Sequence, residues 1–154
     1  MIRLLFLSAI VLFAGIASAL AQDAAGEPVV QEPIVRVAVE PDIVSVGQPV
    51  RLRVTVLGPT WFPKPPIYST FEIPNAVTRL PPNSSFPTSE RIDGVTWSGI
   101  VRSYQIYPLL AAPYELSGQS VTITFADPQT QKPVETIVRI PVIRFSAKNT
   151  WSSR

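Results

Sequence analysis

Two pairs of carboxylates are the residues whose types and spacing could support acid–base chemistry. Glu40 and Asp42 flank a proline, and Glu90 and Asp93 stand three positions apart. A glycosidase places two carboxylates on either side of the scissile bond, one as the acid and the other as the base or nucleophile. Each pair here lies at the end of an expected strand, where acidic side chains commonly form turns. The sequence therefore favours a structural role for both pairs over a catalytic one.

Other catalytic and metal-binding groups are scarce. The chain has no cysteine and no histidine, which excludes thiol catalysis, thiolate metal sites and any role of an imidazole. Lys64, Lys132 and Lys148 fall in expected loops or in the tail, and the sequence has no G-x-S-x-G, S-x-x-K or phosphate-binding glycine motif. It also lacks the clustered acidic residues that calcium requires. We therefore predict a protein that is not an enzyme and binds no cofactor.

The basic residues show no pattern typical of nucleic-acid binding. The formal net charge is +2, and the arginines are spread along the chain without a run or a basic helix. Arg51 and Arg53 are two residues apart, which places them on one face of an expected strand. We interpret that face as solvated rather than as a phosphate site, and we expect no nucleic-acid partner.

The first 21 residues have the features of a secretory signal peptide. Arg3 supplies a basic start, residues 4–16 are apolar, and Ala19-Leu20-Ala21 is a small-x-small cleavage site. An uncleaved anchor is the alternative. Residues 22–154 then amount to about 133 residues, one ordinary domain, and no later apolar run approaches the ~20 residues of a membrane span. We expect an exported protein of the periplasm or cell envelope, with no span in the mature chain.

Short strands separated by turns are expected after a flexible leader at 22–33. The longest, Trp97–Pro108, is apolar on both faces, which is typical of the centre of a sheet, and Asp93-Gly94 before it predicts a hairpin turn. The other expected strands cover 34–40, 50–57, 67–73, 76–80, 120–126 and 134–143, with a return segment at 114–118. About seven to eight strands without helical periodicity predict an all-β, immunoglobulin-like antiparallel β-sandwich over 34–145 and a polar tail at 146–154. A small barrel is the alternative.

The loop of residues 58–66, GPTWFPKPP, is the best candidate for a binding site. Its four prolines cannot lie in a central ladder, because each lacks an N–H. Trp61 and Phe62 could present a rigid apolar surface to a protein or a sugar, with Lys64 and Tyr68 nearby. The alternative, which we favour slightly, is that the aromatic side chains cover the end of the core.

Two other aromatic residues are expected to be structural. Trp97 begins the long strand and is predicted to lie in the core. Tyr114 lies at the start of the return segment, and its hydroxyl is predicted to bond back to the main chain, as a corner tyrosine does.

An ordered set of short motifs resembles the BatD family, proteins of bacterial aerotolerance operons. The motifs are V-S-V-G-Q-P-V-R-L at 44–52, F-E-I-P at 71–74, S-Y-Q-I-Y-P-L at 103–109, Y-E-L at 114–116 and V-T-I at 121–123. The resemblance covers about residues 34–145 and corresponds to the N-terminal immunoglobulin-like domain of that family. Ala112-Pro113 departs from it, because the family usually has a turn glycine there. Family members usually continue into further sandwich domains and a membrane helix, so we expect a short relative or the first domain alone, and membrane anchoring is in doubt.

The resemblance implies a role in binding rather than in catalysis. BatD proteins act at the cell envelope with von Willebrand-type membrane proteins and a MoxR-type ATPase, in oxygen tolerance and stress. The resemblance carries no site residues, since its motifs are scaffold positions. We therefore expect a protein-interaction module of the cell envelope. A carbohydrate-binding or adhesin-like β-sandwich is the alternative.

Overall fold

The computed structural model describes residues 31–150. The predicted signal peptide, most of the predicted leader and residues 151–154 of the predicted tail lie outside the described residues. All regular secondary structure within 31–150 is β-strand, which confirms the all-β prediction. In that range no helix has the length and apolar character that a membrane crossing demands.

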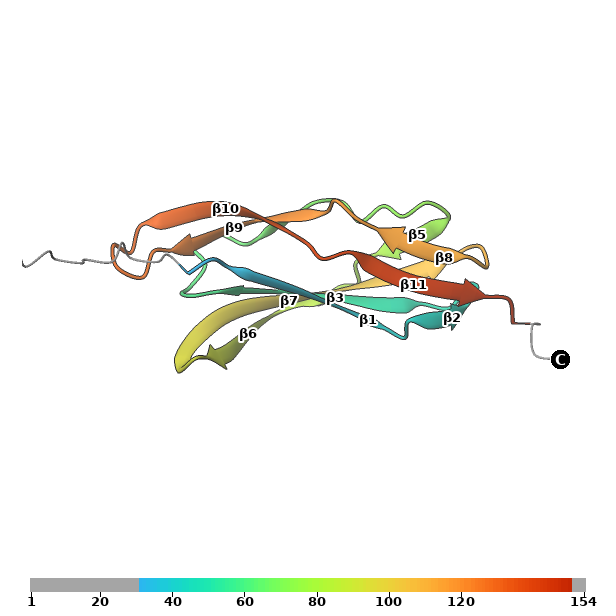
Figure 1. Ribbon diagram of the computed structural model, residues 1–154, viewed down its shortest axis with the longest axis horizontal. Coiled ribbons are helices and arrows are strands. Elements are labelled where there is room, and N and C mark those ends of the chain that lie inside the picture. The colour runs from blue at the N-terminus through green and yellow to red at the C-terminus, as the bar shows by residue number, and fades with distance from the viewer. Residues whose placement is uncertain (1–30, 151–154) are drawn as a thin grey trace, which may run out of the picture.

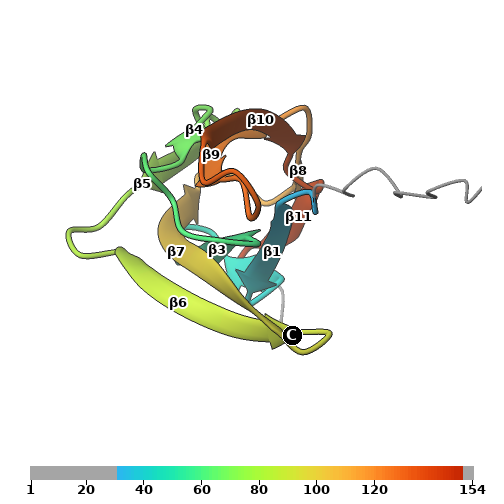
Figure 2. The same cartoon turned by 90° about the vertical axis from the view of Figure 1, so that its left-hand side faces the viewer.

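Eleven strands form two layers. Their bounds are β1 (Ile34–Glu40), β2 (Ile43–Ser45), β3 (Val50–Gly58), β4 (Ile67–Tyr68), β5 (Ala76–Arg79), β6 (Ser85–Ile92), β7 (Val95–Pro108), β8 (Pro113–Leu116), β9 (Ser120–Ala126), β10 (Pro133–Arg139) and β11 (Ile143–Lys148). The long sheet has the order β1-β3-β7-β5, with β6 also paired to β7. Two three-stranded sheets, β10-β9-β4 and β2-β11-β8, complete the fold. Figures 1 and 2 show β4, β9 and β10 stacked over β3 and β7, as in a sandwich.

Strand β7 is the centre of the long sheet, as its composition predicts. It pairs with β3 along one side, and with β6 and then β5 along the other. Asp93 and Gly94 have φ angles of 49° and 79° between the paired residues Ile92 and Val95. Positive φ at both central residues is the signature of a type I′ turn, so the predicted hairpin is present.

The two faces of β7 are buried by different elements. Tyr104 and Ile106 pair with Leu52 and Val50 and belong to the main core between the layers. Trp97 is 5% exposed, as expected of a buried side chain, but it lies outside that core cluster. Its face is the outer face of the long sheet, because side chains alternate along a strand.

Gly99 explains how part of this outer face is covered. A Cβ at Gly99 would lie 2.6 Å from Leu57 Cδ2 and 2.7 Å from Thr88 Cγ2. Side chains from β3 and β6 therefore occupy the space above the glycine. Leu57 is fully buried here although it is not part of the main core.

Several strand boundaries differ from the prediction. Strand β6 lies outside all the expected strands, and this polar segment forms a strand because the hairpin turn pairs it with β7. The expected strand 134–143 is divided at Pro141, which cannot donate to a ladder, into β10 and β11. Strand β11 runs to Lys148, beyond the predicted end of the domain at 145, and the expected strand 67–73 is limited to Ile67 and Tyr68. Strands β2 and β6, which no expected strand covers, and the division into β10 and β11 raise the number of strands above the seven or eight expected.

Candidate functional site

The four residues predicted to form a binding site divide into two groups. Trp61 is 55% exposed, and Lys64 is exposed as well. Phe62 and Tyr68 are partly buried and pack against the core. A Cβ at Gly58 would lie 2.8 Å from Phe62 Cε1, which shows that the Phe62 ring folds back over β3. The structure therefore turns two of these side chains outward and two inward.

The loop that carries Trp61 is tied to the end of β9. Ala126 donates its backbone N–H to the carbonyl oxygen of Trp61 at 3.1 Å, and the hydroxyl of Thr60 donates to the carbonyl oxygen of Ala126. Thr124 and Ala126 are almost completely buried, although outward positions of a sheet are often exposed. The proline loop thus covers this end of β9 and holds Trp61 at a fixed place on the surface.

Tyr68 makes a contact between the layers rather than on the surface. The guanidinium carbon of Arg102 lies 4.1 Å from the centroid of the Tyr68 ring, a cation–π geometry. The Tyr68 hydroxyl is buried and has no hydrogen-bond partner among the described residues. Burial raises the pKa of Tyr68 to about 12; Arg102 acts against this shift, and Tyr104 adds to it. Tyr68 is therefore part of the packing.

Two of the four carboxylates considered for catalytic pairs, Glu40 and Glu90, lie beside arginines. Glu90 accepts two hydrogen bonds from Arg36 Nη1, at 2.9 and 2.7 Å. Glu40 lies 3.5 Å from Arg53, and Asp93 is in the hairpin turn. Across residues 31–150, no three acidic, histidine or cysteine side chains come together as metal ligands. Glu40 and Glu90 are thus each paired with an arginine, and Asp93 serves the hairpin turn.

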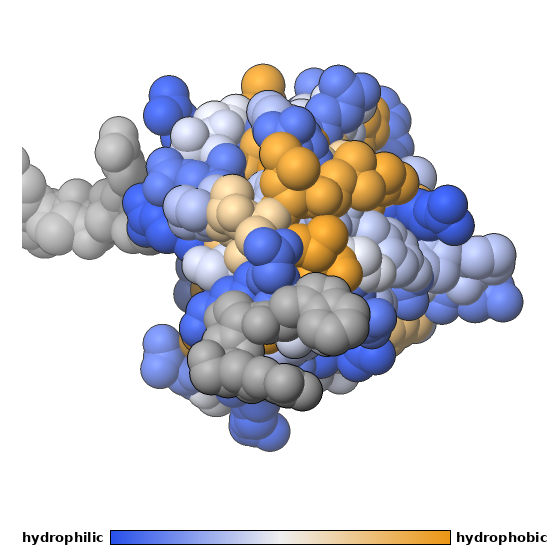
Figure 3. Space-filling view, turned by 90° about the vertical axis from the view of Figure 1, so that its right-hand side faces the viewer, coloured by the Kyte–Doolittle hydropathy of each residue, from blue (hydrophilic) through white to orange (hydrophobic). Residues whose placement is uncertain are grey.

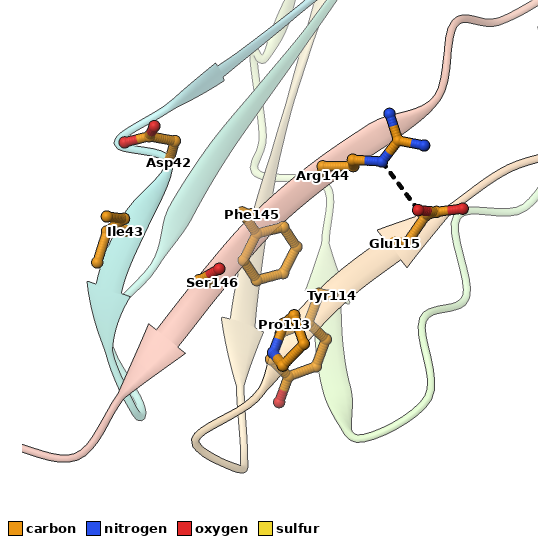
Figure 4. A pocket seen from close by; sticks show the side chains of 8 residues that line it. All are labelled: Asp42, Ile43, Pro113, Tyr114, Glu115, Arg144, Phe145 and Ser146. Atoms are coloured by element: carbon orange, nitrogen blue, oxygen red, sulfur yellow. Dashed lines mark hydrogen bonds and ion pairs between the residues drawn. The ribbon is translucent and has the colours of Figure 1, made fainter.

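A shallow hollow of about 500 Å³ lies on the outer face of the β2-β11-β8 sheet. Figure 4 shows Arg144 and Glu115 pointing toward each other across β11 and β8, with Asp42 and Ile43 on the β2 side. The Nε of Arg144 lies 2.8 Å from Glu115 Oε2. Because these two charges neutralise each other, the β8–β11 side of the hollow offers little to hold an ion.

Apolar side chains gather at one end of the molecule, as Figure 3 shows. The loop between β7 and β8, residues 109–112 with the sequence LLAA, lies at this end and is named the end loop here. Leu109 and Leu110 are 54% and 53% exposed. This segment is not among the binding-site candidates that the sequence indicates. The sequence feature that could have indicated this surface is an apolar run at a place where polar turn residues are usual.

Hydrogen bonds hold the end loop in place. The Tyr114 hydroxyl accepts the N–H of Leu110 at 3.1 Å and lies 2.9 Å from the carbonyl oxygen of the same residue. The carbonyl oxygen of Asn75 is 3.0 Å from this hydroxyl and accepts the N–H of Leu109 at 2.9 Å. Ala147 donates its N–H to the carbonyl oxygen of Ala112. Tyr114 is therefore the corner tyrosine that the sequence predicted.

A groove of about 480 Å³ lies on the outer face of the long sheet. Arg36, Arg51 and Arg53 line it with Glu90, and Phe86 and Val101 are its apolar members. The Arg36–Glu90 pair joins β1 to β6, although β3 and β7 lie between them. Adjacent strands are about 4.8 Å apart, so this ion pair crosses above two strands. We name this surface the arginine groove.

Two surfaces therefore stand out, and they differ in character. The end loop is apolar and rigidly held, whereas the arginine groove is polar and rich in hydrogen-bond donors. Comparison of the chain with known protein families, curated proteins and solved structures finds no match.

Proposed function

We propose that this protein is a non-enzymatic, exported protein-interaction module of the bacterial cell envelope, and that the end loop is its contact surface. The observation that carries the proposal is the exposure of Leu109 and Leu110 on a loop that Tyr114 fixes. Burial of a leucine side chain stabilises a complex by about 1.5–3 kcal/mol when it is complete, and by roughly half of that from the exposure seen here. A loop already held in one conformation loses little entropy on binding.

The resemblance to the BatD family supports the choice of partner. In that family the partners are von Willebrand-type membrane proteins, which act with a MoxR-type ATPase in oxygen tolerance. We therefore propose a von Willebrand-type membrane protein as the partner that covers the end loop.

A capture experiment tests this proposal. The purified protein is immobilised and exposed to detergent-solubilised bacterial envelope, and retained proteins are identified by mass spectrometry. We expect retention of von Willebrand-type membrane proteins and its loss in the Leu109→Ser/Leu110→Ser variant. The matched control is Ile137→Ser, which removes a side chain that is 71% exposed on β10, away from the end loop; this variant should retain the partner.

Two results would contradict the proposal. If both variants retain the partner as well as the unchanged protein does, the contact is not at the end loop. If the protein retains no von Willebrand-type protein at all, the proposed partner is wrong, even though the fold is unaffected. Circular dichroism of each variant ensures that loss of binding is not loss of folding.

A carbohydrate-binding or adhesin-like function is the second candidate, and the exposure of Trp61 favours it. An indole that is 55% exposed on an anchored loop can stack on the apolar face of a sugar ring. Envelope polysaccharide should then change the tryptophan fluorescence of the unchanged protein, and should leave that of Trp61→Ala unchanged. An identical response of both proteins to the polysaccharide would exclude Trp61 as the contact.

A further inference from the structure

The arginine groove contains a regular array of positive charge. Arg51 and Arg53 point to the same face of β3, and Arg36 lies beside the next position, because it pairs with Thr55. Positions two residues apart on a strand are about 6.8 Å apart. The backbone positions of Arg51 and Arg53 therefore have the period of an extended chain, and the Arg36 side chain, which reaches Glu90 of β6, adds a third positive charge to the same face.

A row of polar and charged side chains crosses the sheet at one end of this array. The register places Glu40, Arg51, Gln105 and Arg79 side by side on β1, β3, β7 and β5. Four arginines on this face, counting Arg36 and Arg53, meet two glutamates, Glu40 and Glu90, which leaves an excess of positive charge.

Arg51 is the donor best placed to receive a ligand. It forms no ion pair with any residue from 31 to 150 within the usual distance, whereas Arg36 and Arg53 each have a glutamate. The Gln105 side-chain oxygen accepts a hydrogen bond from the Tyr107 hydroxyl at 2.9 Å, and the amide nitrogen of Gln105 is a second donor on the strand next to Arg51. Arg51 also lines a second hollow of about 320 Å³ next to the groove.

We infer that the arginine groove binds an extended acidic peptide segment of a partner protein, with carboxylates at alternate positions. Alternate side chains of an extended peptide share one face and repeat every ~6.8 Å, which matches the spacing of Arg51 and Arg53. A carboxylate accepts two parallel hydrogen bonds from a guanidinium, which makes arginine its preferred partner. Glu90, already bound to Arg36, shows that this face accommodates a carboxylate.

The groove favours a peptide over an acidic polysaccharide. Phe86 is 49% exposed beside Val101, so the groove offers apolar contact for aliphatic side chains between the carboxylates. Arg36 and Arg53 can exchange their glutamate partners for carboxylates of the peptide, because exposed ion pairs contribute little to stability. This surface is on a different part of the molecule from the end loop, so the inference does not depend on the proposed function.

Fluorescence anisotropy with a labelled synthetic peptide tests the inference. The probe alternates glutamate with threonine, and the purified protein is titrated into it at low salt. We expect binding that weakens as salt is added and that falls about tenfold in Arg51→Gln and in Arg53→Gln, because each loses a charge-assisted contact. Arg144→Gln is the matched control, since Arg144 is an exposed, paired arginine on β11; it should bind as the unchanged protein does.

Two further probes separate geometry from net charge. A peptide with the same number of glutamates at every third position places successive carboxylates on opposite faces, and it should bind more weakly. Equal binding of the two peptides would overturn the inference, and so would unchanged binding by Arg51→Gln. Displacement of the peptide by an acidic polysaccharide, with the same dependence on Arg51, would assign the groove to carbohydrate instead. None of these results affects the test of the end loop.

Discussion

At the scale of single residues, Tyr68 shows how an apparent site residue can serve packing. Its ring lies against the Arg102 guanidinium, and its hydroxyl is buried without a partner in the part of the chain that the structure describes. An unpaired buried hydroxyl destabilises the folded state by roughly 1–3 kcal/mol, whereas a cation–π contact stabilises it by about 0.5–2 kcal/mol. The ring therefore stabilises the contact between the layers, and the hydroxyl opposes it.

Replacement of Tyr68 by Phe should change the response of stability to alkaline pH. Burial raises the pKa of Tyr68 to about 12 from the ordinary 10.0, with Arg102 opposing the shift and Tyr104 adding to it. As pH rises, Tyr68 therefore ionises in the unfolded chain before it does so in the folded protein. The stability that the neutral Tyr68 contributes is fully present below pH 10 and is lost as pH rises from 10 to 12. Urea unfolding at several pH values should show a smaller alkaline loss for Tyr68→Phe, with stability at pH 7 equal or about 1 kcal/mol higher.

A spectroscopic titration provides the control. The absorbance change of tyrosinate near pH 12 should lose one component in Tyr68→Phe, and in Arg102→Met that component should move to higher pH. If Tyr68→Phe titrates like the unchanged protein, Tyr68 is not the buried tyrosine that the structure describes.

At the scale of secondary-structure elements, β6 is an edge strand, and Pro87 protects its free edge from pairing with another strand. Ser103 donates its N–H to the carbonyl oxygen of Ser84, and hydrogen-bonded pairs alternate along an antiparallel ladder. The backbone groups of Phe86 and Thr88 then point to β7, and those of Pro87 point to the free edge. The missing N–H of Pro87 therefore costs no hydrogen bond to β7. Because the free edge of β6 lacks a donor at this position, it is a poorer template for pairing with another strand.

Replacement of Pro87 by Thr should increase self-association through β6. The substitution restores a donor at the free edge and adds a β-branched residue with high strand propensity. Sedimentation velocity over a range of concentrations should show more dimer or larger species than the unchanged protein does. Pro82→Thr, in the exposed loop before β6, is the control and should have no such effect. Equal association of the two variants would show that Pro87 does not protect the edge.

At the scale of the whole molecule, one core joins all three sheets. Val54 of the long sheet, Ile123 of the β10-β9-β4 sheet and Ile143 of the β2-β11-β8 sheet belong to a single buried cluster. The two three-stranded sheets are also continuous in the chain, because β10 leads into β11. The domain should therefore unfold as one cooperative unit.

Truncation of Ile143 tests this cooperativity. The side chain is 1% exposed, so Ile143→Ala should lower the free energy of unfolding by about 2–5 kcal/mol. Far-ultraviolet circular dichroism and tryptophan fluorescence should move together to the same lower urea midpoint. Ile137→Ala, at an exposed position of β10, should cost less than about 0.5 kcal/mol. Separate transitions for the two probes would mean that the β2-β11-β8 sheet unfolds independently.

Local sequence patterns are sufficient to predict the strands of the core. Strands at 50–57 and 120–126 alternate apolar and polar residues, and this period alone decides which side chains face inward. The Asp93-Gly94 turn was also predictable, because few residue pairs tolerate positive φ at both positions. The corner role of Tyr114 was likewise predictable from its place at the start of the return segment.

The candidate surfaces depend on residues that are distant in the sequence. Strand β6 has the composition of a loop, and only its pairing with β7 makes it a strand. Arg51 and Arg53 could be assigned to one face, but Arg36 joins them through the register of β1 on β3. The end loop is held by Tyr114, which is close to it in the chain, but also by Asn75, which is distant in the sequence.

Side-chain period and turn chemistry are local properties, so the order of amino acids is enough to predict an all-β chain with a central long strand. Which surfaces remain exposed depends on the three-dimensional arrangement of the strands. Trp61 and Phe62 are neighbours in the chain, yet one faces solvent and the other packs against the core. The physical reason is that burial depends on what the rest of the chain places over a side chain, and pairing between distant strands sets that arrangement.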